Sequence, residues 1–161
     1  RNVRDHLIRA KVAGDPKKYP ERQQRGMKKC GKNCTACPYI REVKSIKTNK
    51  TEWKINQSLN CEISNCVYMI QCKKDNCGLR YIGETKRILK FRLADHRGYV
   101  NNQDLSTATG EHFNSPGHSL ADMSITILER VRQKDDLYRK EREKYFIRRF
   151  YTFYGGLNRQ P

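Results

Sequence analysis

Three closely spaced cysteines and a fourth further along the chain could hold a metal ion. Cys30, Cys34 and Cys37 follow a Cx3Cx2C pattern, and Cys61 comes 24 residues after the last of them. Tetrahedral Zn²⁺ suits this pattern, because a tight turn offers neighbouring sulfurs and a distant fourth sulfur closes a loop. The spacing is less regular than in a paired CxxC finger, so reduced free thiols are the alternative interpretation.

Two tyrosines lie in short apolar runs that flank a polar loop. The runs predict a β-hairpin with Tyr68 in one strand and Tyr81 in the other, over residues 67–72 and 79–83. Gly83 then ends the second strand, which predicts a bend or a close backbone approach. A phenol beside such a glycine would suit a site that cuts phosphate esters. A tyrosine in a strand is, however, more often an ordinary core residue.

Two predicted helices carry polar groups beside their apolar stripes. In the first, over residues 85–99 with Thr85 as N-cap, Arg92 and His96 lie one turn apart next to the stripe. In the second, over residues 135–150, Glu143 shares a face with three large apolar residues, Phe146, Ile147 and Phe150. A carboxylate that faces a core needs a partner. A metal ion is one candidate, and an ion pair with Arg139 is the other.

The remaining segments predict short elements that must position these groups. Residues 44–55 indicate a basic β-ribbon with a turn at Asn49-Lys50 and with Trp53 packed against the cysteine site. Residues 123–131 predict a third strand, and a glycine turn at 155–158 can return Asn158 to the last helix. Residues 1–12 predict an amphipathic helix and residues 15–29 an extended polar linker.

The charge balance indicates a polyanionic partner. The net charge is +17 and the pI is about 9.8, as expected of a protein that binds nucleic acid. Residues 1–54 hold 16 Lys/Arg against 5 Asp/Glu, so the N-terminal third is the stronger candidate for an electrostatic arm. A merely solubilising surface is the alternative. We expect phosphate contacts from Lys28, Lys29, Lys32, Lys86, Arg87, Lys90 and Arg97.

Length and hydropathy limit the fold and the compartment. The 161 residues allow one domain of ordinary size, or a compact domain with a small satellite. Mean hydropathy is −0.95, and no window approaches a membrane span or a secretory signal. We expect a soluble intracellular protein, in which seven cysteines serve metal binding or catalysis rather than disulfides. The missing initiator methionine indicates a fragment of a longer polypeptide.

The order of the candidate residues resembles the GIY-YIG nuclease superfamily. Val67-Tyr68, Tyr81-Ile82-Gly83, Arg92 with His96, Glu143 and Asn158 follow the family order and approximate spacing over residues 64–158. The first triplet departs from the pattern, because Cys66 stands where the family has a glycine. We expect Cys66 to be buried and to remain a free thiol.

A closer resemblance is to the endonuclease domain of Penelope-like retroelements. Those domains carry a cysteine pair between the two triplets and a histidine pair downstream, and Cys72, Cys77, His112 and His118 occupy these places. Their Cx4C and Hx5H spacings predict a structural Cys2His2 zinc site that pins the hairpin loop to the insertion after the Arg92 helix. Two loose thiols and two surface histidines are the alternative. The upstream cysteines also resemble the linker that follows the polymerase of such elements.

These resemblances imply an α+β fold in two parts. Residues 64–161 would form the nuclease domain, with a small three-stranded antiparallel sheet flanked by helices. Residues 1–63 would form a basic, Cys-rich, zinc-binding linker module.

The superfamily resemblance also implies roles for the site residues in hydrolysis of a DNA phosphodiester. Glu143 would hold one Mg²⁺ or Mn²⁺, and Arg92 would bind the scissile phosphate. Tyr68 would deprotonate or orient the attacking water, with His96 as a nearby proton acceptor. Tyr81 would position water or phosphate, and Asn158 would steady the group by hydrogen bonds.

The retroelement resemblance implies a biological setting. The enzyme would nick nuclear target DNA and leave a 3′ hydroxyl that primes reverse transcription of the element's RNA. A reverse transcriptase domain would lie upstream on the same polypeptide. A structure-specific DNA repair nuclease and a non-catalytic, zinc-containing nucleic-acid-binding module are the two alternatives.

Overall fold

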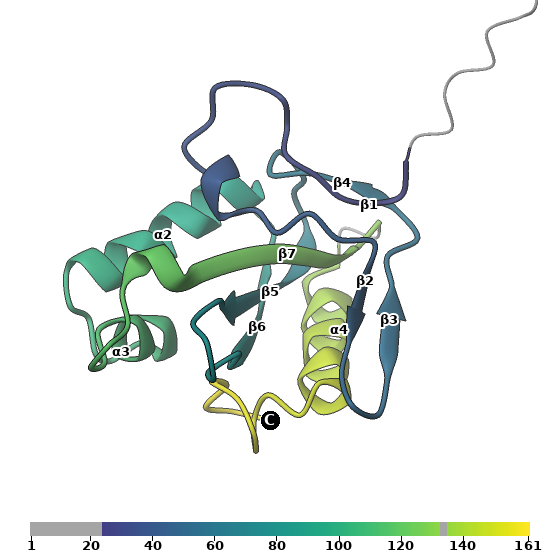
Figure 1. The fold of residues 1–161 in the computed structure, drawn as a ribbon. Coiled ribbons are helices and arrows are strands. Elements are labelled where there is room, and N and C mark those ends of the chain that lie inside the picture. The colour runs from purple at the N-terminus through teal and green to yellow at the C-terminus, as the bar shows by residue number, and fades with distance from the viewer. Residues whose placement is uncertain (1–23, 133–134) are drawn as a thin grey trace, which may run out of the picture.

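An antiparallel sheet of three strands forms the centre of the computed structural model, which describes residues 24–132 and 135–161. β5 (Cys66–Cys72) lies between β6 (Arg80–Thr85) and β7 (Met123–Arg130). Helices α2 (Leu89–Asn101) and α3 (Ala108–Phe113) pack on one side of the sheet, and α4 (Asp136–Arg149) packs on the other (Figure 1). This architecture confirms the predicted α+β fold with a small three-stranded antiparallel sheet.

Both faces of the sheet are buried, so the central strand alternates between two cores. Tyr68 and Ile70 belong to the core that includes α2, whereas Val67 and Met69 belong to the core that includes α4. Side chains alternate with period two along a strand, so a strand buried on both faces is almost wholly apolar.

Short strands precede the central sheet. β1 (Gly26–Met27) pairs in parallel with β4 (Ser58–Leu59), and a 3-10 turn spans Cys37–Tyr39. β2 (Ser45–Lys47) pairs antiparallel with β3 (Glu52–Lys54), as predicted for the basic ribbon, and the two form a separate sheet.

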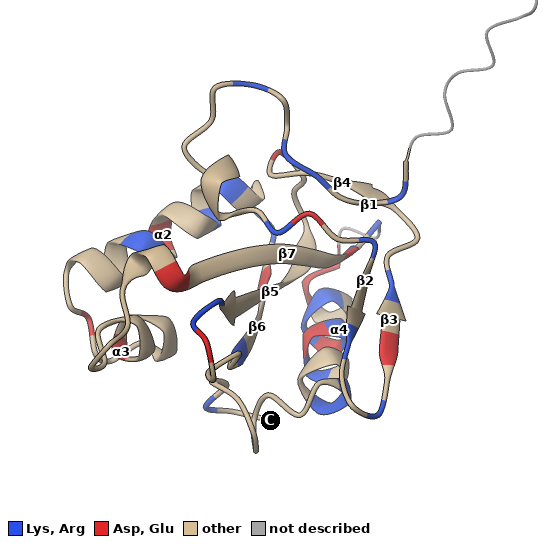
Figure 2. Ribbon diagram, in the orientation of Figure 1, with Lys and Arg blue, Asp and Glu red and all other residues tan. Residues whose placement is uncertain are grey.

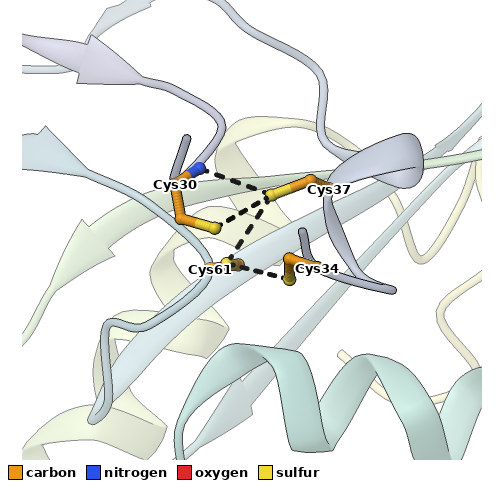
Figure 3. A group of neighbouring side chains, drawn as sticks. All are labelled: Cys30, Cys34, Cys37 and Cys61. Atoms are coloured by element: carbon orange, nitrogen blue, oxygen red, sulfur yellow. Dashed lines mark hydrogen bonds between the residues drawn. The ribbon is translucent and has the colours of Figure 1, made fainter. Parts of the chain in front are cut away.

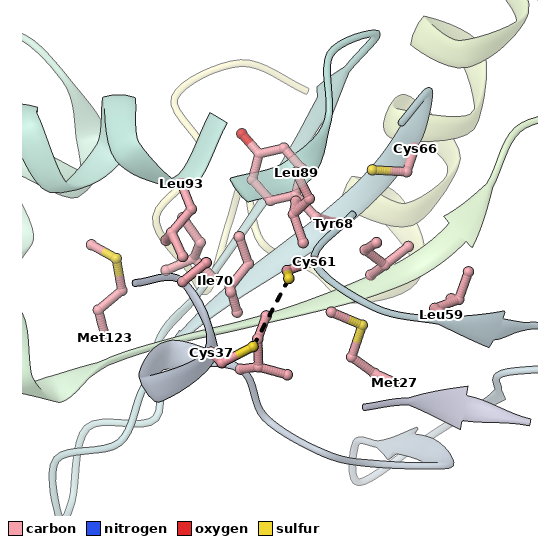
Figure 4. Close-up of a cluster of buried hydrophobic side chains, with 14 of the residues drawn as sticks. Met27, Cys37, Leu59, Cys61, Cys66, Tyr68, Ile70, Leu89, Leu93 and Met123 are labelled. Carbon is pink, nitrogen blue, oxygen red and sulfur yellow. Dashed lines mark hydrogen bonds between the residues drawn. The ribbon is translucent and has the colours of Figure 1, made fainter. Parts of the chain in front are cut away.

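The apolar core is continuous across residue 63. Met27 and Leu59 pack in the same cluster as Tyr68 and Leu93 of α2 (Figure 4), and Ile40 also belongs to it. The predicted boundary between residues 1–63 and 64–161 stays a prediction, and the described residues on its two sides share one apolar core. The predicted helix of residues 1–12 and most of the predicted linker lie outside the described residues. No helix that the structure describes is long and apolar enough to cross a bilayer.

Two local predictions are wrong. β6 does not end at Gly83 but continues to Thr85, which pairs with Cys66, and the helix begins only at Leu89. Thr85 therefore caps no helix; its Oγ1 accepts the Arg87 N–H at 3.1 Å. The Trp53 side chain borders both apolar clusters, including the one that contains Cys37 and Cys61. Its Nε1 donates to the Leu128 carbonyl at 2.9 Å, and its ring centre lies 4.8 Å from that of Phe146 on α4.

The predicted close approach at Gly83 is confirmed, although it occurs within the strand. Tyr68 lies opposite Gly83 in the β5–β6 register. A Cβ atom built on Gly83 would lie 2.4 Å from the Tyr68 Oη and 2.5 Å from its Cζ. Only glycine therefore lets the Tyr68 ring, which is 0% exposed, lie across β6.

We predict that Gly83→Ala lowers the free energy of unfolding by about 1–3 kcal/mol, because the added methyl overlaps a ring that has no free space. Gly98→Ala is the matched control. A Cβ at Gly98, inside α2, would meet nothing within 4 Å, so alanine there should stabilise by about 0.5–1 kcal/mol. Urea denaturation measures both. A Gly83→Ala protein as stable as the parent would contradict this packing.

Candidate active site and metal-ligand clusters

A chain of buried hydrogen bonds joins β5 to α2 and α3. The Tyr68 Oη lies 2.7 Å from His96 Nε2 and accepts the Arg92 Nε–H at 3.0 Å. His96 Nδ1 lies 2.8 Å from Thr109 Oγ1. Because Arg92 donates to the phenol oxygen, the phenol O–H donates to His96 Nε2. The second ring nitrogen then donates its proton to Thr109.

Burial sets the protonation of this chain. Enclosure raises the pKa of Tyr68 well above its ordinary value, although the Arg92 guanidinium opposes the shift. Burial, together with the positive charge of Arg92, lowers the pKa of His96 to about 3. Near neutral pH both groups are therefore uncharged, and the shared proton resides on the Tyr68 oxygen.

A cavity of about 370 Å³ lies beside this chain of hydrogen bonds. Residues from β6, α2, α3, α4 and the C-terminal segment line it. Five of the six predicted catalytic residues contribute to its wall: Tyr81, Arg92, His96, Glu143 and Asn158. Tyr68 lies behind the wall and is bonded to two of them. The structure thus brings all six together, although they are spread over 91 positions of the sequence.

Glu143 enters the cavity from α4 as a half-buried carboxylate. No cation lies within 4.0 Å of it among the described residues, because Arg139 pairs with Glu84 and with Asp136. The alternative of an Arg139–Glu143 ion pair is therefore wrong. Burial, reinforced by Glu84, raises the pKa of Glu143 to about 7. A half-buried carboxylate without an ion-pair partner offers the oxygen donor that Mg²⁺ or Mn²⁺ prefers.

Asn158 clamps the edge of β6. Its Oδ1 accepts the Ile82 N–H at 2.8 Å, and its Nδ2 donates to the Ile82 carbonyl at 2.8 Å. The side-chain amide thus pairs with the N–H and the C=O of one residue, as a residue of a neighbouring antiparallel strand would. It fixes the backbone between Tyr81 and Gly83.

Sequence reasoning missed Thr109. The residue is 1% exposed in the short helix α3, and its hydroxyl lies 2.8 Å from His96 Nδ1, so it gives the second ring nitrogen a partner. The polar run that ends at Thr109 indicates a loop, and nothing local marks one threonine in it. Only the contact with α2 reveals the role.

The four N-terminal cysteines converge (Figure 3). Sγ–Sγ distances are 3.4 Å for Cys30–Cys37, 3.7 Å for Cys34–Cys61 and 3.9 Å for Cys37–Cys61. Four thiolates at about 2.3 Å from one zinc ion would lie about 3.8 Å apart. The donor set and its spacing fit a closed tetrahedral zinc site.

The second predicted ligand set also converges. The donor atoms of Cys72, Cys77, His112 and His118 all lie within 4.8 Å of one another. Cys77 Sγ is 3.6 Å from His112 Nε2, while the enclosed Nε2 of His118 lacks a hydrogen bond of good geometry. A metal ion would satisfy that nitrogen, so the set fits zinc. It would join the β5–β6 loop to α3 and the residues that follow it.

Cys66 is 0% exposed and is a free thiol, as predicted. Burial raises the pKa of its thiol to about 12, so it stays protonated. It lies opposite Thr85 of β6 and Arg130 of β7, and it belongs to neither ligand set.

The basic residues predicted to bind phosphate differ in availability. Lys29 and Lys86 are exposed, whereas Lys32 pairs with Glu62 and Arg87 pairs with Asp95. The Arg97 guanidinium lies 5.2 Å from the centre of the Tyr39 ring and links α2 to the 3-10 turn. Lys28 bonds to Gln24, and Lys90 lies over the Phe91 ring. Arg97 therefore has a structural contact instead of a free head group.

We predict that Glu143→Gln stabilises the fold more at pH 8 than at pH 5 when no Mg²⁺ or Mn²⁺ is added. The folded pKa of about 7 exceeds the ordinary value of 4.5. The charged Glu143 carboxylate therefore destabilises the folded state. This cost is absent below the unfolded pKa and reaches its full size above the folded pKa. We expect the gain to be larger at pH 8 by about 1–2 kcal/mol, after allowance for solvent screening.

Chemical denaturation of parent and variant at both pH values measures this difference. Glu141→Gln is the control, because Glu141 is exposed on the same helix. Its effect should not change between the two pH values. An equal gain from Glu143→Gln at both would show that the carboxyl has no raised pKa.

Comparison with protein-family models matches residues 64–156 to the GIY-YIG catalytic domain. Comparison with curated proteins and with solved structures finds no match. The matched segment spans more than half of the chain and contains the hairpin, the Arg92 helix and Glu143. The chain therefore belongs to the GIY-YIG family of nucleases.

Proposed function

We propose that this nuclease is a divalent-metal-dependent DNA endonuclease that nicks one strand and leaves a 3′ hydroxyl. One observation carries the proposal: a cation on α2 and a carboxylate without an ion-pair partner on α4 face the same cavity, with two tyrosines beside them. Phosphodiester hydrolysis requires positive charge that stabilises the phosphate in the transition state and a general base that accepts a proton from the attacking water.

We assign the phosphate contact to Arg92 and the metal contact to Glu143. The Tyr68 oxygen accepts the Arg92 Nε–H, and Asp95 Oδ2 lies 3.4 Å from Arg92 Nη1. These contacts orient the planar guanidinium, whose remaining N–H groups can meet a phosphate. Glu143 would hold the divalent ion by a carboxylate oxygen. When bound, the ion supplies positive charge to the phosphate oxygens.

We assign the handling of water to the two tyrosines and His96. Tyr81 lines the cavity and would position the water or the phosphate. Tyr68, behind the wall, would draw the proton from the water and pass its own to His96 Nε2, 2.7 Å away. Burial opposes ionisation of Tyr68, so the adjacent Arg92 must stabilise the phenolate. Asn158 would hold Tyr81 in place through the Ile82 clamp.

We further propose that both ligand sets hold structural zinc. Four protein donors leave no open position for water, so neither ion would take part in hydrolysis. The N-terminal module of residues 1–63 and the nuclease domain of residues 64–161 would then be stabilised by one zinc each.

We place the enzyme in a Penelope-like retroelement that acts in the nucleus. Two features support this assignment by resemblance. The first is the Cys2His2 set, with its cysteines between Tyr68 and Tyr81 and its histidines downstream, and the second is the basic, cysteine-rich segment before the two tyrosine strands. The 3′ hydroxyl of the nick would prime copying of the element's RNA by a reverse transcriptase domain upstream on the same polypeptide.

Nicking of supercoiled plasmid with Mg²⁺ or Mn²⁺ tests the proposed activity. We expect Glu143→Ala to lower the rate by on the order of 100-fold or more, because the carboxylate ligand of the ion is removed. Glu141→Ala, an exposed position on the same helix, should nick like the parent.

Extension of the nick by a DNA polymerase without prior phosphatase treatment checks the 3′ hydroxyl. Equal nicking by the parent and Glu143→Ala would refute the assignment, and binding without nicking would favour the non-catalytic alternative.

Elemental analysis of protein purified without chelator tests the zinc sites. We expect about two zinc ions per chain in the parent and about one in either Cys61→Ser or Cys77→Ser, because each change removes one ligand from one set. Cys66→Ser is the control: it also removes a buried thiol, but not from either set. A parent without zinc, or an equal loss in all three variants, would contradict the assignment.

A further inference from the structure

We propose that the β2–β3 ribbon, residues 45–54, binds the backbone of duplex DNA beside the cut. This inference rests on the proposed endonuclease function and adds an element that precedes the family-matched segment. Figure 2 shows basic segments along both strands of the ribbon and at the turn between them.

The ribbon separates an apolar face from a charged one. Ile46 and Trp53 lie directly opposite each other and face inward; Ile46 is 1% exposed, and Trp53 packs on α4. The outward positions carry Lys47 and Lys54, with Lys50 in the turn, and all three are exposed. Because the apolar face packs against the protein, the three exposed lysines remain accessible to a partner.

The ribbon lysines are not used inside the molecule. None of the three ammonium groups lies within 4.0 Å of a carboxylate in the ranges that the structure describes, although Glu52 stands opposite Lys47 across the ribbon. Three unpaired cations on a narrow strip complement a phosphate backbone.

The ribbon is fixed relative to the cavity. Arg149 of α4 donates to the Glu52 carbonyl at 2.9 Å, and Arg80 of β6 donates to the Lys47 carbonyl at 2.9 Å. The Arg80 carbonyl in turn accepts the Leu157 N–H at 2.8 Å, next to Asn158 in the cavity wall. These bonds link the ribbon through Arg80 to the segment that lines the cavity, so the two keep a fixed relative position.

The side chains favour a duplex over a single strand. Proteins that hold single strands stack bases on exposed aromatic rings. The ribbon's one aromatic ring, Trp53, points inward and donates its N–H to the Leu128 carbonyl. A two-stranded ribbon also has the width that the major groove of B-DNA admits. The outward face therefore offers charge contacts to phosphates flanking a groove.

The test compares two triple variants of equal net charge in duplex binding without divalent metal. The first is Lys47→Gln, Lys50→Gln and Lys54→Gln. The control is Lys73→Gln, Arg130→Gln and Arg132→Gln, which removes three exposed charges outside the ribbon. Fluorescence anisotropy at several salt concentrations gives affinity and salt dependence for a duplex and for one of its strands.

We expect the ribbon variant to bind the duplex at least about tenfold more weakly than the control. Its salt slope should be smaller than that of the control by about 2–3, because each lysine that no longer neutralises a phosphate lowers the slope by about one. Equal affinity and slope for the two variants would overturn the ribbon proposal while leaving the nuclease assignment intact. An equal loss on single strands would overturn the duplex assignment. A parent that binds no duplex, by contrast, would count against both the ribbon and the proposed endonuclease.

Discussion

The contact between Tyr68 and Gly83 governs the arrangement of the site. Since no side chain intervenes at Gly83, the phenol crosses the edge strand and reaches α2, where Arg92 and His96 complete its hydrogen bonds. A buried polar group must be paired, so this network fixes how α2 packs on the sheet. The same bonds then fix Thr109 and α3 through the second ring nitrogen of His96.

Helix α4 combines three functions along one face. Near its start, the buried Arg139 neutralises Glu84 of β6 and holds the helix to the sheet. One turn later Glu143 enters the cavity, and three residues further Phe146 supports Trp53 of the ribbon. Because Arg139 is engaged by Glu84, Glu143 is left without an ion-pair partner. The free carboxylate of Glu143 therefore depends on the Arg139–Glu84 ion pair, which lies outside the cavity.

The two ligand sets join segments that the sheet alone does not hold. The N-terminal strands are only two or three residues long, and strands so short contribute little stability. Cys37 and Cys61 meet across 24 residues, and Cys77 and His112 across 35. Only 36% of the residues are hydrophobic, so the apolar core is modest. Metal ions bound at both sets would link these distant positions and add stability that the core does not provide.

The sequence by itself determined the elements and the chemical types of the site. Period-two and helical patterns are local, so the hairpin, the third strand, the last helix and the spacing of the ligands could be predicted from neighbouring residues. The order of the motif residues also indicated which six would converge. Only the tertiary structure decided the partners: Arg139 with Glu84, Trp53 with α4, and His96 with Thr109. These contacts form between segments whose relative placement depends on packing of the whole chain, so no local pattern encodes them.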